Sequence, residues 1–99
     1  MTISELQQWV AGSWRDRPTE DRPTTEQQLL FIIEEFGEVA EAIRKGQGNK
    51  KHKDFEANLG SEFADMIISL VTLANSHNVD LDREIEQFKT KITKRRQSR

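Results

Sequence analysis

Several kinds of residue are scarce in this chain of 99 residues, and each scarcity excludes a class of protein or site. There is no cysteine, which excludes disulfides, thiolate metal sites and zinc fingers. No apolar run approaches the roughly 20 residues that span a bilayer. The first residues also lack the basic and apolar regions of a signal peptide. We therefore expect a soluble, cytoplasmic protein with no membrane partner.

Apolar residues are also few for a domain of this length. Hydrophobic residues make up 34% of the chain and aromatic residues only 7%. The length fits a single domain over residues 1–99, and a domain of this size buries somewhat more than ~60% of its unfolded surface. Its core would be thin as a monomer, so self-association would add to its stability.

The chain has no strong charge of either sign. Its 15 basic and 17 acidic residues give a net charge of −2, so no overall field favours a nucleic acid polymer as partner. The charges are unevenly distributed, however. Residues 34–41 contain four acids and no base, whereas residues 89–99 contain six bases and no acid.

Apolar residues recur at helical spacing in four segments and alternate nowhere, which predicts an all-α fold of four helices. The first helix covers about residues 3–13, behind a capping box formed by Thr2 and Glu5. The second begins at Thr25, with Gln28 as the reciprocal capping residue, and ends at Gly46. Apolar residues cover more than one stripe of this second helix, so we expect it to be buried on two sides.

The third and fourth helices follow from similar signals. Asn58 is a suitable N-cap for the third helix, which extends to about residue 76. Asn78 can take the left-handed conformation that closes it. Asp80 then caps the fourth helix, whose end is strongly basic.

Two polar loops join the first three helices. The loop over residues 15–25 holds both prolines and no apolar residue. Trp14 at its edge, together with nearby arginines, can meet a base or a phosphate; alternatively, Trp14 is a core residue and the arginines are solvated. These arginines are Arg15, Arg17 and Arg22. The second loop, residues 46–58, carries three lysines and His52 at residues 50–53, which suit either phosphate attraction or a solvated connector.

Two helical segments carry acids that have no base beside them. Glu35 and Glu38 are three residues apart, as are Glu62 and Asp65, and residues three apart share a helix face. If the two helices face each other, these four carboxylates converge. They would repel one another and raise their own pKa values, a penalty that a divalent cation removes. Oxygen-only ligands suit Mg²⁺ or Mn²⁺.

The acids of these two segments are also compatible with other kinds of site. An exposed acidic face fits Glu41, which can pair with Lys45 four residues later. A di-iron bundle requires Glu-x-x-His pairs, and neither His52 nor His77 has a glutamate three residues before it. Magnesium-assisted hydrolysis of a phosphate ester or anhydride fits an all-oxygen cluster, with Glu34 able to orient or deprotonate the attacking water.

The order of the acids resembles a known family. Glu34-Glu35-x-x-Glu38, then 23 residues, then Glu62-x-x-Asp65 is similar to the signature of the MazG-type all-α nucleoside triphosphate pyrophosphohydrolases. The stretches IIEEFGEVAEAIRKG and EFADMIISLVTLANSHNVDLD resemble the two central helices of that family. The resemblance covers roughly residues 25–96.

The resemblance implies a four-helix bundle, assembled as a homodimer or homotetramer, that hydrolyses nucleoside triphosphates to monophosphate and pyrophosphate with Mg²⁺. Such enzymes act as house-cleaning enzymes on canonical or damaged deoxynucleotides. By matching positions, the metal ligands would be Glu35, Glu38, Glu62 and Asp65. Glu34 would lie beside the attacking water or an additional metal. The expected catalytic residues are Glu34 and Glu38. Expected phosphate contacts are Lys89, Lys94, Arg95 and Arg96, and Trp14 or Trp9 would meet the base.

The chain also departs from the family pattern. Thr93 stands where an asparagine often precedes the basic cluster, and Ser69 stands where some relatives have a tyrosine, so base preference does not carry over. Two other functions share the acidic pattern. One is a phosphoribosyl-ATP pyrophosphohydrolase, and the other is a catalytically silent helical oligomerisation module.

Overall fold

The computed structural model of the chain describes residues 1–47 and 52–97. These residues form four α-helices, one short 3-10 helix and no strand. The helices are α1 (Ile3–Arg15), α2 (Thr25–Gln47), α3 (His52–Ser76) and α4 (Leu81–Gln97), with the 3-10 helix η1 at Thr19–Asp21. The all-helical fold that the sequence predicts is confirmed.

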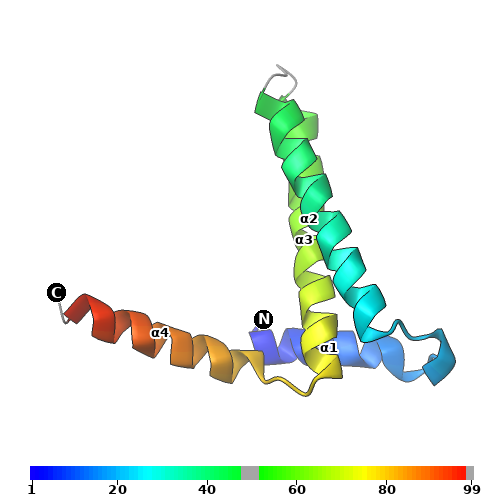
Figure 1. The fold of residues 1–99 in the computed structure, drawn as a ribbon, viewed down its shortest axis with the longest axis vertical. Helices are drawn as coiled ribbons and strands as arrows, with labels where there is room; N and C mark the ends of the chain where they lie inside the picture. The colour runs from blue at the N-terminus through cyan, green and yellow to red at the C-terminus, as the bar shows by residue number, and fades with distance from the viewer. Residues whose placement is uncertain (48–51, 98–99) are drawn as a thin grey trace.

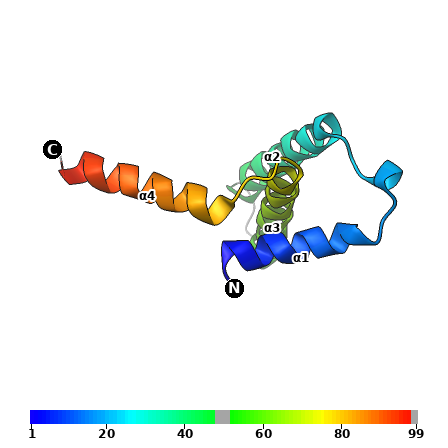
Figure 2. The same cartoon turned by 90° about the horizontal axis from the view of Figure 1, so that it is seen from below.

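Helices α2 and α3 form a long antiparallel hairpin, and the other two helices lie at its foot (Figure 1). Helix α1 crosses beneath the hairpin and packs against α3, while α4 contacts α1 and then runs outward (Figure 2). The radius of gyration is 17.0 Å, compared with about 13 Å for a compact domain of this length. A single chain is therefore an open, extended shape.

Capping residues fix where the first two helices begin. Thr2 and Glu5 form the predicted capping box at α1, with both hydrogen bonds at 3.0 Å. The capping prediction for α2 is wrong by one residue. Thr24 Oγ1 accepts from the Gln27 amide at 3.2 Å, and Gln27 Oε1 accepts from the Thr24 amide at 2.9 Å. Because the segment contains Thr-Thr and Gln-Gln, two neighbouring Thr-x-x-Gln pairs could form the capping box. Gln28, the predicted partner, is instead buried.

The connection between α2 and α3 is shorter than the sequence suggests. Helix α2 continues past Gly46 to Gln47, and α3 already begins at His52, so the predicted loop over residues 46–58 and the N-cap at Asn58 are wrong. Lysine, glutamate and alanine are good helix formers, so a polar composition without proline does not end a helix. Lys50 and Lys51 lie outside the described residues.

The turn between α3 and α4 forms as the sequence predicts. Its hydrogen bonds with α1 could not be predicted from the residues of the turn itself. Asn78 has a φ of 56°, and Asp80 Oδ1 accepts from the Arg83 amide at 3.2 Å, as a cap should. The Gln7 amide of α1 then holds both sides of the turn. Its nitrogen donates to the Val79 carbonyl at 2.8 Å, and its oxygen accepts from the Leu81 amide at 3.0 Å. These contacts set the direction in which α4 leaves.

Very little apolar surface is buried within one chain. Among the described residues only Val10, Val39 and Val71 are buried apolar side chains. The expected burial of α2 on two sides is not met, since Ile33 and Phe36 are 65% and 61% exposed. The accessible surface is 8177 Å², about 2,400 Å² more than the roughly 5,800 Å² of a compact monomer of this mass.

Candidate metal and nucleotide site

Acidic side chains face one another where α2 packs against α3. The pKa of Glu62 is raised above its ordinary value by a hydrogen bond with Glu38, by partial burial, and by the negative charges of Glu38, Asp65 and Glu35. A hydrogen bond between two carboxyl groups requires a proton on one of them, which explains the direction of this shift. The two helices therefore bring acids from both predicted pairs into electrostatic contact.

Two oxygen atoms of this acidic group are buried and have no hydrogen-bond partner, namely Glu35 Oε2 and Glu62 Oε2. The other oxygen of Glu35 accepts from the Ser69 hydroxyl at 3.0 Å. A buried carboxylate oxygen without a partner is unfavourable, and native structures rarely leave one unsatisfied. Hard oxygen atoms of this kind are the ligands that Mg²⁺ and Mn²⁺ prefer. The donor set therefore fits a divalent cation.

The acids are nevertheless not gathered into a finished metal site. Over residues 1–47 and 52–97, no group of three or more His, Asp or Glu side chains has the arrangement that would hold a metal ion. Glu38 and Asp65 are largely exposed, as is Glu34, the predicted partner of the attacking water. The acidic group is therefore partly open, with Glu35 and Glu62 half-buried beside these exposed acids.

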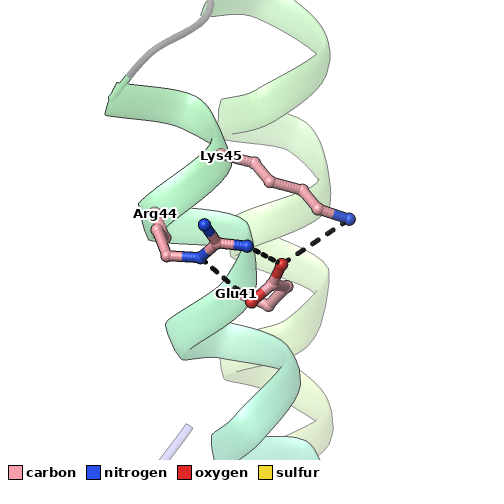
Figure 3. Close-up of polar contacts among 3 residues, drawn as sticks. All are labelled: Glu41, Arg44 and Lys45. Carbon is pink, nitrogen blue, oxygen red and sulfur yellow. Dashed lines mark hydrogen bonds and ion pairs between the residues drawn. The ribbon is translucent and has the colours of Figure 1, made fainter.

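Glu41 lies one turn further along α2 and has the opposite surroundings (Figure 3). The guanidinium of Arg44 donates to it from Nε at 3.2 Å and from Nη2 at 2.5 Å, and Lys45 Nζ lies 3.9 Å away. The hydrogen bond from Arg44, together with the two positive charges, lowers the pKa of Glu41. The predicted pairing of Glu41 with Lys45 is confirmed, but Glu41 is half-buried and its hydrogen bonds come from Arg44.

A cavity of about 340 Å³ lies between α1, α2 and α3, beside the acidic group. The side chains that line it include both indole rings and several hydroxyl groups: Trp9, Val10, Ser13, Trp14, Arg17, Pro23, Gln28, Phe31, Ile68, Ser69 and Thr72. Trp14 is half-buried and Trp9 is 64% exposed. The cavity is thus lined by aromatic rings together with hydroxyl and amide groups.

Two of the arginines near Trp14 hold this wall in place. The Arg17 guanidinium lies over the Trp14 ring, 4.6 Å from its centroid, which is a cation–π contact. Arg22 Nη2 donates to the Trp14 carbonyl at 3.0 Å. The loop after α1 therefore folds back onto the tryptophan.

Two residues of this region were not predicted from the sequence. Gln28 is 8% exposed; its amide donates to the Pro23 carbonyl at 3.1 Å and accepts from Ser76 at 3.1 Å. Ser69 lines the cavity and also contacts Glu35. The spacing held a signal for Ser69, because it follows Asp65 by four residues and so lies on the same face of α3.

One chain does not bring the basic residues of α4 to the acids. Lys94, Arg95 and Arg96 belong to the last turn of α4, which points away from α2 and α3 (Figures 1 and 2). Lys89 lies earlier on the helix and pairs with Glu86 at 3.3 Å. Their predicted contact with phosphate requires either a moved α4 or another chain.

Residues 23–99 match the MazG nucleotide pyrophosphohydrolase domain. The chain belongs to the MazG family. This match covers α2, α3 and α4, and it supports a nucleotide pyrophosphohydrolase activity at the level of the family. Trp9 and Trp14 lie outside the matched residues, so both indole rings of the cavity come from a part of the chain that the family match does not include.

No curated protein matches the chain. In the part of the chain that the structure describes, none of the helices combines the length and apolar character needed to cross a membrane.

Proposed function

We propose that this protein is a Mg²⁺-dependent hydrolase that cleaves (deoxy)nucleoside triphosphates to monophosphate and pyrophosphate, in a house-cleaning role on canonical or aberrant nucleotides. One observation carries the proposal. In a member of the MazG family, Glu35 and Glu62 each keep a buried oxygen without a partner, in a group of acids that raises the pKa of Glu62. Such a group binds a hard cation favourably because the cation removes the repulsion.

The residues that would hold the metal are those of the two acidic pairs: Glu35, Glu38, Glu62 and Asp65. Mg²⁺ held there, for which Mn²⁺ can substitute, would supply positive charge to offset that of the phosphates and a Lewis acid for hydrolysis. Glu34 and Glu38 are the proposed catalytic residues. The exposed Glu34 carboxylate is available to accept a proton from the attacking water and to orient it.

The cavity beside the acids is the proposed position of the base. Indole rings stack on nucleobases, and stacking of this kind contributes roughly 1–3 kcal/mol per base. Trp14, contacted by Arg17 and Arg22, is the less exposed of the two candidates. Trp9 lines the same cavity from a more exposed position.

We further infer that the working protein is a homodimer or homotetramer in the cytoplasm. The apolar side of α2 is exposed in one chain, and the surplus of about 2,400 Å² over a compact monomer lies in the range that obligate homodimers bury. A second copy would also provide a basic α4 end for the phosphates, through Lys89, Lys94, Arg95 and Arg96. Sedimentation analysis should therefore give at least twice the mass of the 11.5 kDa chain; a monomer would contradict the inference.

A substrate panel tests the activity. The protein is incubated with Mg²⁺ and each nucleoside triphosphate, and the products are separated by anion-exchange chromatography. Monophosphate and pyrophosphate in equal amounts are expected. Turnover of phosphoribosyl-ATP alone would instead assign the protein to that related reaction, and no turnover by a folded oligomer would make it an oligomerisation module.

A further inference from the structure

The hydroxyl of Ser69 makes an unusual contact for a serine within a helix. Helical Ser and Thr hydroxyls commonly donate to the carbonyl three or four residues earlier. Several hydroxyls in this chain do so, including Thr72 to Ile68 at 2.8 Å and Thr90 to Glu86 at 3.0 Å. Ser69 instead donates across to α2, where its Oγ lies 3.0 Å from Glu35 Oε1.

This contact decides how Glu35 is held. One carboxylate oxygen of Glu35 is occupied by the Ser69 hydroxyl, while the other, Oε2, is buried and has no hydrogen-bond partner. A hydrogen bond on one oxygen restricts the rotation of the carboxyl group and leaves the second oxygen available to a cation. Hydrogen bonds from residues behind a metal ligand commonly orient that ligand in this way.

Ser69 also faces the cavity that the tryptophans line. The same side chain therefore lies at the boundary between the proposed base position and the acidic group. Thr72 lines the cavity too, one turn further along α3, but its hydroxyl is taken up by its own helix. Of these two hydroxyls that line the cavity, only that of Ser69 donates to a carboxylate.

We propose that Ser69 is a positioning residue that orients Glu35 for metal binding. This inference rests on the proposed function, since it assigns Glu35 to a divalent cation. Loss of a residue that orients a metal ligand typically weakens metal affinity or activity 10- to 100-fold. Ser69→Ala should therefore weaken Mn²⁺ binding by about that factor, whereas Ser69→Thr, which keeps a hydroxyl, should retain most of the affinity.

The experiment measures Mn²⁺ affinity in the full chain without nucleotide, by electron paramagnetic resonance of free Mn²⁺. Thr72→Val is the matched control, because it removes a cavity hydroxyl that does not touch Glu35; its Mn²⁺ affinity should be unchanged. Helical content by circular dichroism establishes that each variant is folded. Equal Mn²⁺ affinity of the unsubstituted protein and Ser69→Ala overturns the role of Ser69 while leaving the metal site intact.

A double-mutant cycle supplies the second test and separates the two proposals. If Ser69 acts through Glu35, adding Ser69→Ala to Glu35→Gln should cost no further affinity. A full additional loss in the double variant would assign Ser69 a structural role and overturn the inference. Absence of Mn²⁺ binding by the unsubstituted protein would overturn the metal site itself, and the role of Ser69 with it.

Discussion

Glu38 and Glu41 lie one turn apart on α2 and differ in how their charge is offset. Glu41 has basic residues three and four positions later, and their hydrogen bond and charges lower its pKa. Glu38 instead faces Glu62 on α3, and the pKa of Glu62 is raised by that contact and by the other acids. Within one helical turn, the charged neighbours of a carboxylate therefore change from basic, at Glu41, to acidic, at Glu38. Only the acidic group that includes Glu38 is suited to binding a cation.

The largest expected effect is the loss of turnover when one charge is removed from the acidic group that includes Glu38. Glu38→Gln should reduce nucleoside triphosphate turnover below detection, because a proposed metal ligand is lost while the side chain keeps its size. Glu41→Gln, one turn away, should leave turnover near that of the unsubstituted protein. Product formation measured with saturating Mg²⁺ checks both, and equal turnover in the two variants would contradict the assignment.

A second prediction concerns Mg²⁺ and pH together. The pKa of Glu62 is raised in the folded chain. The stability that the Glu62 carboxyl contributes is therefore present at low pH and is lost as the pH rises through its folded-state pKa. Mg²⁺ should replace the lost proton, and a ligand at 100 times its Kd adds about 2.7 kcal/mol to the free energy of unfolding. Thermal unfolding should therefore show a larger Mg²⁺-induced rise in Tm at pH 7.5 than at pH 5. An equal rise at both values would remove Glu62 from the metal site.

The smallest expected effects are changes in Tm, which should have opposite signs for Glu62→Gln and Glu41→Gln. Without Mg²⁺ at neutral pH, Glu62→Gln should raise the Tm, because it removes a charge that its neighbours disfavour. Glu41→Gln should lower the Tm slightly at low salt and not at high salt, since exposed ion pairs are weak and screened. Shifts of the same sign in both variants would show that the surroundings of the two acids do not differ as described.

Local signals in the sequence were sufficient for much of the fold. The capping box at Thr2, the left-handed Asn78 and the cap at Asp80 depend on a few neighbouring residues, and all three are confirmed. The start of α3 was predicted wrongly, because a polar segment without proline remains compatible with a helix. The direction of α4 was beyond prediction, since the Gln7 contacts that set it join positions more than 70 residues apart.

The candidate site likewise has some features that the sequence predicts and others that it does not. Spacing alone predicts that Glu35, Glu38, Glu62 and Asp65 converge. Over residues 1–47 and 52–97 they form no finished metal site, although the other three acids together raise the pKa of Glu62. The contact between Ser69 and Glu35 depends on the register of α2 against α3, which spacing within one helix does not specify. The tryptophan cavity depends on how α1 crosses the hairpin. The last turn of α4 points away from α2 and α3, and the proposed contact of its basic residues with phosphate depends on the assembled protein.

The most direct test of the central claim is anomalous X-ray diffraction from crystals of the assembled protein grown with Mn²⁺. The account predicts an anomalous peak between α2 and α3, bound by carboxylate oxygens that include those of Glu35 and Glu62. Crystals in which these acids remain without Mn²⁺ and point away from Glu38 and Asp65, within and across subunits, would contradict it.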